Sequence, residues 1–248
     1  MYAILCATPE ELAALKTALH TDPEPQIHGP TTVWTGTHDG EPIVVALAGI
    51  GKVNAAAAAT VLLATFGARA LVFAGVAGGL NPKFPVGSVL LGERLAIHDY
   101  GVISGRSFTP TAYGVIPIGA PRLTELTAVS APVREVLARL GERVAGRLDA
   151  PPHLGGIITA DYFLNCAETR DELHAAFGAD AIDMESGAVA QVAQAWGAEL
   201  YVIRTLSDLA GEDSHLTYDQ MVGMAARNSA LCVAALLEIL GEARRIAT

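Results

Sequence analysis

Cysteine is scarce in this sequence. Its 248 residues include three, Cys6, Cys166 and Cys232, which are far apart and have neither a metal-binding nor a disulfide spacing. Disulfides persist in oxidising compartments and are rare in the cytosol. The cysteine content therefore predicts a protein of the reducing cytosol.

Basic residues are also in deficit. There are 16 Lys and Arg against 26 Asp and Glu, which gives a formal charge of −10, and the basic residues form no cluster. This balance argues against nucleic acids and anionic membranes as partners. No basic segment or cleavage site precedes the first apolar run, and no uninterrupted apolar run is long enough to span a bilayer. We therefore expect a cytoplasmic protein without a signal peptide, a nucleic-acid partner or a membrane partner.

Apolar residues, by contrast, are abundant at 51% of the chain. The length suits one domain, residues 1–248. Short β-branched runs alternate with Ala-rich segments, which predicts an α/β fold with a largely parallel sheet. Strands are expected at 2–7, 31–48 (a hairpin turning at Asp39-Gly40), 70–74, 86–97, 154–160, 181–184 and 199–206. Helices are expected at 9–19, 52–66, 131–148, 170–177 and 186–196, followed by a last helix from a capping box at 217–220 to about 245; residues 102–126 are expected to be a loop.

Two carboxylates follow the ends of apolar strands in residues 181–208. Glu185 comes after the first strand of this stretch, and Asp208 comes after the second. Ligands of open α/β sheets bind outside the carboxyl ends of the strands, and burial there raises a carboxyl pKa, which suits acid–base chemistry. An alternative is that Glu185 is a first-turn acid favoured by the helix dipole and Asp208 is a turn residue.

A third carboxylate, Glu11, has two interpretations. Thr8, Pro9 and Glu11 suit the N-cap, the first and the third position of a helix, so Glu11 would close a capping box. It also lies at a strand-to-helix junction, where a carboxylate can face a ligand.

Two glycine-rich turns could hold a ligand. Residues 49–51 open a helix and could cradle an anion, but no Walker spacing follows them, so a close-packed turn is the preferred interpretation. The glycines of 75–79 let backbone N–H groups approach a ligand. They depart from GxGxxG, although Asp99 lies near the distance at which a dinucleotide site carries its acid.

The pair His98-Asp99 ends the predicted strand 86–97. Such a pair occurs in catalytic sites, but no Ser or Cys nucleophile motif accompanies it. We therefore favour a structural contact between the two side chains over a catalytic role.

Several motifs carry a family resemblance by their order and spacing. They read ATPEEL, GIGKVNAA, FAGVAGGLNP, HDYG, TADYFLN, DMESGAVAQVA, VIRTLSD and DSHLTYDQ. Together they resemble the 5′-methylthioadenosine/S-adenosylhomocysteine nucleosidases of the purine nucleoside phosphorylase and uridine phosphorylase superfamily, over nearly the whole chain except about 103–142. The resemblance implies a single-domain three-layer sandwich with a mixed, largely parallel sheet flanked by helices.

The resemblance also implies a reaction. It is hydrolysis of the N-glycosidic bond of 5′-substituted adenosines to adenine and the 5′-thioribose, with no metal and no organic cofactor. Glu11 would deprotonate the attacking water with Arg204 nearby, and Asp208, oriented by Ser207, would protonate adenine N7. An acid and a base on opposite sides of an oxocarbenium-like transition state is the inverting arrangement.

The remaining site residues follow from the same motifs. Glu185 would accept from the 2′ and 3′ hydroxyls, and Met184 would pack on the sugar. Phe163 would stack on the purine while the backbone of Leu164 reads the base edge. The list is completed by Val76, Ala77 and Gly78 beside the ribose and the water, and by Ile50, Val102 and Tyr218 in an apolar 5′ pocket. Val76 replaces a hydroxyl residue of many relatives and Thr8 a larger apolar one, and the family forms homodimers in which the partner completes the 5′ pocket.

Three alternatives stay open. A nucleoside phosphorylase would need arginines to clamp phosphate, whereas Lys16, Lys52 and Arg69 are the basic residues before Arg94. A futalosine-type nucleosidase would share the chemistry and differ in substrate. A non-catalytic nucleoside-binding protein would have no need of all three carboxylates.

Overall fold

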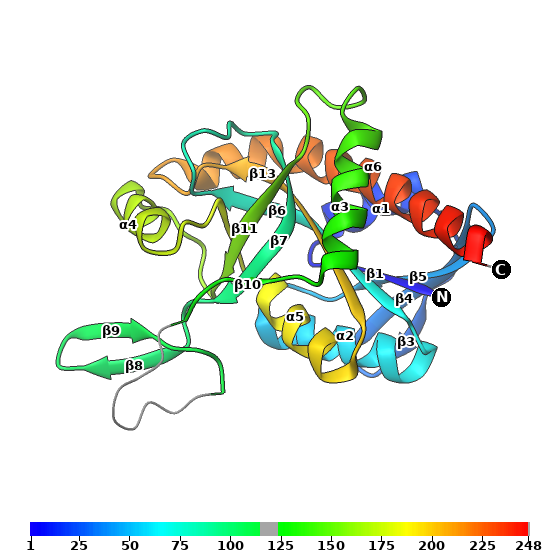
Figure 1. The fold of residues 1–248 in the computed structure, drawn as a ribbon, viewed down its shortest axis with the longest axis horizontal. Coiled ribbons are helices and arrows are strands. Elements are labelled where there is room, and N and C mark those ends of the chain that lie inside the picture. Colours follow the sequence, from blue (N-terminus) through cyan, green and yellow to red (C-terminus); the bar gives the residue numbers. More distant parts are fainter. Residues whose placement is uncertain (115–123, 248) are drawn as a thin grey trace.

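The computed structural model describes residues 1–114 and 124–247, in which helices flank a large mixed sheet (Figure 1). The helices are α1 (Pro9–Ala18), α2 (Lys52–Phe66), α3 (Ala131–Val144), α4 (Ala167–Phe177), α5 (Ser186–Trp196) and α6 (Ser214–Ala247). The first strands are β1 (Tyr2–Cys6), β2 (His20–Thr21), β3 (Gln26–His28), β4 (Thr31–His38), β5 (Glu41–Leu47), β6 (Ala70–Gly79) and β7 (Val89–Ile97). The others are β8 (Gly101–Ser104), β9 (Ser107–Pro110), β10 (Thr127–Ala128), β11 (His153–Thr159), β12 (Ala181–Asp183) and β13 (Glu199–Asp208).

The central strands are parallel, as the alternating pattern predicts. Strand β1 pairs in parallel with β5 and β6, and β13 pairs in parallel with β6. The predicted hairpin is confirmed: β4 and β5 pair antiparallel around Asp39 and Gly40, whose φ angles are 50° and 79°. Two consecutive positive φ angles are typical of the tight turns that join hairpin strands.

Five strands close into a barrel, which corrects the expected three-layer sandwich. Strand β13 pairs with β6 and β7, β7 with β11, β11 with β12, and β12 returns to β6. The ring closes because β6 is ten residues long and changes neighbours: its Ala70 end pairs with β1 and its Gly78–Gly79 end with β12. The mixed sheet with flanking helices is confirmed, but part of it is curved and closed.

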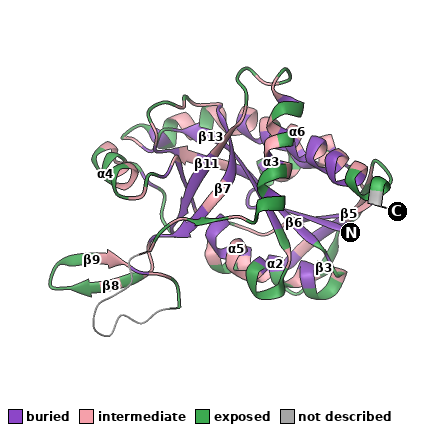
Figure 2. Cartoon of the chain, in the orientation of Figure 1, coloured by how far each residue is buried: buried purple, intermediate pink, exposed green. Residues whose placement is uncertain are grey.

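The helices bury both faces of the sheet. One core lies under α1, α3 and α6, with Leu15, Leu137 and Leu236 among its members. A second lies under α2 and α5 and includes Leu62 and Val189. A third, smaller cluster contains Leu80 and Ile182. Figure 2 shows the central strands buried between these layers. Burial on both faces explains why the strands read as continuous apolar runs.

Helix α6 is long and apolar enough, by length and composition, to cross a membrane. In the described structure, however, 56% of its most apolar 18-residue segment is buried inside the molecule. The core helix of a globular protein has the same length and composition. It packs against α1, α3, β6 and β13. The capping box predicted at 217–220 is wrong, because α6 already begins at Ser214 and the Thr217 hydroxyl donates to the carbonyl of Asp213.

Residues 102–126 are only partly the predicted loop. Strands β8 and β9 form a hairpin that projects from the body (Figure 1), and residues 115–123 lie outside the described part. The hairpin escaped prediction because its sequence lacks a clear alternation of apolar and polar residues. The sequence pattern also does not predict the short strands β2, β3 and β10. The other differences concern ends: β6 extends to Gly79, α3 stops at Val144 and α4 starts at Ala167.

Candidate active site

The end of β6 brings the predicted catalytic residues together. Gly75 is the register partner of Arg204, and Gly78 is that of Asp208. A Cβ atom built on Gly75 would lie 2.2 Å from Glu11 Oε1 and 2.6 Å from Arg204 Nη1. A Cβ on Gly78 would lie 3.2 Å from Asp208 Oδ1. The glycines are therefore needed where these charged groups approach the backbone.

Glu11 is a capping residue and a site residue at once. Its Oε2 accepts from the N–H groups of Ala7 (2.7 Å) and Thr8 (3.1 Å), and the Thr8 hydroxyl accepts from the N–H of Glu11, which completes the predicted capping box. Its Oε1 accepts from the Val76 N–H at 2.9 Å. Each carboxylate oxygen has two lone pairs, so Oε1 keeps one for a further donor. Burial raises the pKa of Glu11, while the charge of Arg204 acts in the opposite direction.

Arg204 is the buried cation of the site, with none of its surface exposed. Its Nε and Nη2 lie 2.9 and 2.8 Å from Asp183 Oδ2, and Nη2 lies 3.1 Å from Glu185 Oε2. The guanidinium also stacks over the Phe73 ring, 4.1 Å from its centroid. A buried charge is tolerated when it is paired and hydrogen-bonded, and here two carboxylates balance it.

Asp183 is a site residue that the sequence analysis missed. Its carboxylate accepts from the Thr159 hydroxyl at 2.5 Å and from both the N–H and the hydroxyl of Ser186. These bonds, with those to Arg204, fix the orientation of the guanidinium. The sequence signal for Asp183 is its position at the end of a strand, two residues before Glu185. The same position also fits a residue that only completes the predicted strand 181–184.

Glu185 joins α5 to the start of α2. It is the N-cap residue of α5, and its Oε1 accepts from the Gly51 N–H at 3.0 Å. The next N–H, of Lys52, donates to Asp161 Oδ1 at 2.8 Å. The anion cradle considered for 49–51 is therefore occupied by carboxylates of the chain itself. Burial raises the pKa of Glu185 to about 7, with the charge of Asp183 adding to the effect and that of Arg204 opposing it.

Asp208 lies at the end of β13 and is almost fully buried. Its Oδ2 accepts from the Ser207 hydroxyl at 3.0 Å, and its Oδ1 accepts from the Ala210 N–H at 2.8 Å. Burial raises the pKa of Asp208, and these hydrogen bonds partly oppose the rise. A carboxyl group with a raised pKa is easier to protonate and so better suited to donate a proton.

The predicted base and 5′ residues lie on loops and element ends around these groups. Phe163 is 48% exposed and meets Tyr218 edge to face, with ring centroids 6.1 Å apart. Burial is the main cause that raises the pKa of Tyr218 to about 12, and nearby carboxylates, Glu11 and Glu185 among them, add to the rise. Of the rest, Leu164, Ala77 and Ser207 are buried, Met184, Val76, Gly78 and Val102 are at least partly covered, and Ile50 is exposed.

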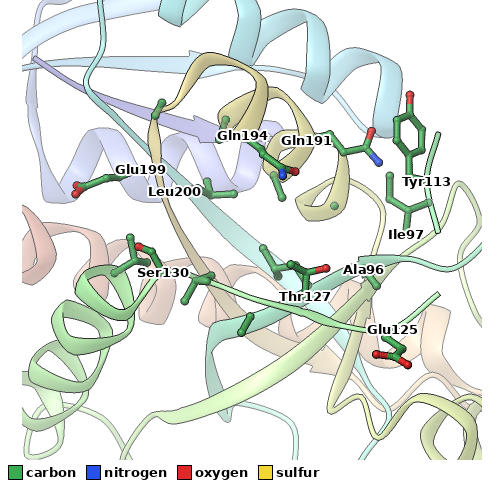
Figure 3. Close-up of a pocket in the computed structure, with 18 of the residues that line it drawn as sticks. Ala96, Ile97, Tyr113, Glu125, Thr127, Ser130, Gln191, Gln194, Glu199 and Leu200 are labelled. Atoms are coloured by element: carbon green, nitrogen blue, oxygen red, sulfur yellow. The ribbon is translucent and has the colours of Figure 1, made fainter. Parts of the chain in front are cut away.

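A separate pocket of about 940 Å³ lies between α5, the start of α3 and the β7–β10 edge (Figure 3). Its lining includes Ile97, Tyr113, Gln191 and Gln194, but none of the predicted site residues of the described chain. Buried charges gather at the β6 end instead. Among the described residues, no group of three or more His, Cys, Asp or Glu side chains is arranged to hold a metal ion.

The chain matches the family model described as "Phosphorylase superfamily" over residues 1–239. It is 38% identical to a 5′-methylthioadenosine/S-adenosylhomocysteine nucleosidase of Mycobacterium bovis, over 96% of each chain. It is 32% identical to an aminodeoxyfutalosine nucleosidase of Campylobacter jejuni, over 96% of this chain and 98% of the relative.

Solved structures agree with the sequence relatives. The Helicobacter pylori 5′-methylthioadenosine/S-adenosylhomocysteine nucleosidase with butyl-thio-DADMe-Immucillin-A superposes with a TM-score of 0.82. The two chains are 26% identical, and the match covers 96% of this chain and 97% of the other. The chain therefore belongs to the phosphorylase superfamily and, within it, to the family of the 5′-methylthioadenosine/S-adenosylhomocysteine nucleosidases.

Proposed function

We propose that this protein hydrolyses the N-glycosidic bond of 5′-substituted adenosines, releasing adenine and the 5′-thioribose. The observation that carries the proposal is a set of three buried carboxylates near the end of β6: Glu11 bonds to Val76, Glu185 pairs with Arg204, and Asp208 lies opposite Gly78. A binding protein would have no reason to bear the cost of burying all of these charges.

Glu11 activates the attacking water. The lone pair left on its Oε1 can accept from a water, and its raised pKa makes it a better base than an exposed glutamate. Arg204 Nη2 binds Glu185 Oε2 at 3.1 Å, and its charge favours the ionised form of Glu11.

Asp208 supplies the proton that the leaving adenine needs at N7. The Ser207 hydroxyl and the Ala210 N–H fix the carboxyl group, and burial favours its protonated form before the reaction. Protonation makes adenine a neutral leaving group and draws electrons from the C1′–N9 bond. Positive charge then develops on the ribose, as in other glycoside hydrolyses.

Glu185 grips the ribose hydroxyls. Accepting two O–H donors favours the ionised carboxylate, which burial otherwise disfavours. Its negative charge then lies next to the sugar, where the oxocarbenium-like transition state carries positive charge. Met184, partly covered, would pack against the sugar face.

Water is favoured over phosphate as the nucleophile. A phosphate dianion needs several free cationic or N–H donors. Arg204 is already shared by Asp183 and Glu185, and the N–H groups of Gly51 and Lys52 already donate to carboxylates. Adenine release measured with and without phosphate tests this: release that requires phosphate would identify a phosphorylase instead.

The 5′ group defines a second candidate substrate. The Campylobacter jejuni relative is named as an aminodeoxyfutalosine nucleosidase, so aminodeoxyfutalosine is the second candidate. The family resemblance marks Thr8 and Val76 as departures from many relatives near the site. Adenine-release kinetics on 5′-methylthioadenosine, S-adenosylhomocysteine and aminodeoxyfutalosine would rank the substrates by kcat/KM.

We also propose a homodimer. The β8–β9 hairpin projects from the body and exposes Ile103 (76%) and Phe108 (45%), although a lone two-stranded hairpin is marginally stable in water. A second copy would cover it, with Val102 of β8 contributing to the partner's 5′ pocket. Light scattering at micromolar concentration should give a dimer; Ile103→Asp should shift it to monomer, whereas Ile27→Asp, equally exposed on β3, should not. A wild-type monomer would overturn the proposal.

The three cysteines are free thiols, which fits a reducing cytosol; the cytoplasmic location stays a prediction.

A further inference from the structure

His98 and Asp99 do not pair with each other; each holds a residue of the loop that follows β11. His98 Nε2 lies 2.5 Å from the Tyr162 hydroxyl, and Asp99 Oδ2 accepts from the Asp161 N–H at 2.9 Å. Two consecutive residues at the end of β7 thus hold two consecutive residues at the end of β11. The structural contact expected from the sequence is replaced by this double attachment.

The hydrogen bonds of His98 fix its tautomer. Its Nδ1 lies 3.1 Å from the Thr159 carbonyl oxygen, which can only accept, so Nδ1 carries the proton. Nε2 then accepts from the Tyr162 hydroxyl. Burial lowers the pKa of His98, which keeps the ring in this neutral form. The ring is also enclosed by Tyr162 and Phe177, at centroid distances of 5.6 and 5.8 Å.

Lys52 completes the attachment of Asp161. Its ammonium contacts Asp99 Oδ1 (2.5 Å) and Asp161 Oδ2 (3.6 Å), and its N–H donates to Asp161 Oδ1. The two neighbouring carboxylates are therefore held by one cation. The same turn donates the Gly51 N–H to Glu185, so the ribose end of the site and the loop after β11 share one support.

The far end of the loop is held by α6, because Asn165 Oδ1 accepts from the Ser214 N–H at 3.1 Å. Residues 161–163 are exposed and have no regular secondary structure. Segments with few buried apolar contacts open at low free-energy cost unless specific bonds restrain them. Leu164, which follows, is buried in a hydrophobic cluster that includes Leu80 and Ile182.

We propose that His98 and Asp99 are positioning residues for the purine base. By holding Tyr162 and Asp161 they fix the Phe163 ring and the Leu164 backbone, the groups assigned to stack on the base and read its edge. The inference rests on the proposed function for the identity of the base. It assigns a role in base affinity to a pair that the reaction itself does not use.

The test compares Tyr162→Phe, Asp99→Asn and the double variant with wild type. The matched control is Glu242→Gln, which removes a surface ion pair with Arg143 between α6 and α3. Each attachment is worth about one hydrogen bond, so KM and the dissociation constant of free adenine should each rise about 5- to 10-fold. kcat should stay within about threefold, and amide exchange at 161–165 should accelerate. The control should change neither affinity nor loop exchange.

Three results would overturn the proposal. The first is unchanged adenine affinity in both single variants; the second is a fall in kcat without a change in KM; the third is loop exchange that stays at the wild-type rate. A melting temperature close to wild type shows that the variants are folded. Wild type that releases adenine from no 5′-substituted adenosine would refute the proposed function instead, while adenine titration and exchange would still decide the role of His98 and Asp99.

Discussion

The backbone N–H of Val76 donates to Oε1 of Glu11 at 2.9 Å, across 65 positions of the sequence. Together with the N–H groups of Ala7 and Thr8 on Oε2, three backbone donors converge on one carboxylate. The capping box of α1 is thereby connected to the end of β6. A glutamine at this position would turn its NH₂ group toward one of these donors.

Glu11→Gln should therefore reduce both activity and stability. Loss of the base should lower kcat by about 10²- to 10⁴-fold, because an amide cannot take a proton from water. The donor left unpaired should cost about 1–3 kcal/mol of stability, more than the sequence alone suggests for a shape-preserving cap. Melting temperature and kcat are measured on one preparation, with the exposed neighbour Glu10→Gln as control. An unchanged kcat would remove Glu11 from the mechanism.

Gly75→Ala should disrupt the site without altering any charged residue. Its methyl group would lie 2.2 Å from Glu11 Oε1 and 2.6 Å from Arg204 Nη1. Both groups are buried and hydrogen-bonded, so moving either one breaks bonds within the site. We expect loss of adenine release and a destabilisation of about 1–3 kcal/mol. Gly146→Ala is the control, since nothing lies within 4 Å of its Cβ position. Equal kcat values for the two variants would contradict the close packing around Gly75.

The local elements could be predicted, because their signals lie within a few residues. The Thr8–Glu11 capping box and the Asp39-Gly40 turn are examples, and both are confirmed. The closed barrel could not, because the two ends of β6 pair with strands whose places depend on the whole chain. The capping pattern at Thr217 failed for a related reason: Ser214 starts the helix earlier.

The site residues also divide into those that local sequence signals indicate and those that depend on partners far away in the sequence. Strand-end position pointed to Glu185 and Asp208, which the structure brings to the end of β6. Asp183 was missed because its partner Arg204 lies 21 positions away, on another strand. Likewise, His98 and Asp99 are adjacent in sequence, which suggests mutual contact, but their partners are 62 to 64 positions further on.

Asp208→Asn should abolish turnover while the fold persists. The asparagine keeps the shape and can still accept from Ser207 or Ala210, but it has no acidic proton for adenine N7. General acid catalysis is typically worth about 10²- to 10⁴-fold, so kcat should fall by that factor and substrate binding should remain. The exposed Asp213→Asn is the control on the neighbouring turn. Near-wild-type kcat in folded Asp208→Asn protein would refute the assignment.

Glu185 should make stability depend on pH in a specific window. Its pKa in the folded protein is about 7, above the ordinary value of 4.5, so the folded state holds a proton that the unfolded state has lost. Stability from this group is complete below about pH 4.5 and is lost as the pH rises through about 7. Glu185→Gln has no proton to lose at this position. The free energy of unfolding of the variant minus that of wild type should therefore increase between pH 4.5 and 7 and level off above.

Urea unfolding of both proteins at half-unit intervals from pH 4.5 to 8.5 measures this difference. Glu11 and Asp208 also have raised pKa values, but they are present in both proteins and so largely cancel. Glu185→Gln also removes one of the two carboxylates that face Arg204. This loss changes the difference in unfolding free energy by a nearly constant amount, because the guanidinium stays charged throughout this pH range. The decisive quantity is thus the slope. A difference that stays flat, or that falls as the pH rises, would mean that Glu185 is ionised in the folded protein even at pH 5. Arg204 and the Gly51 N–H would then outweigh the burial of Glu185.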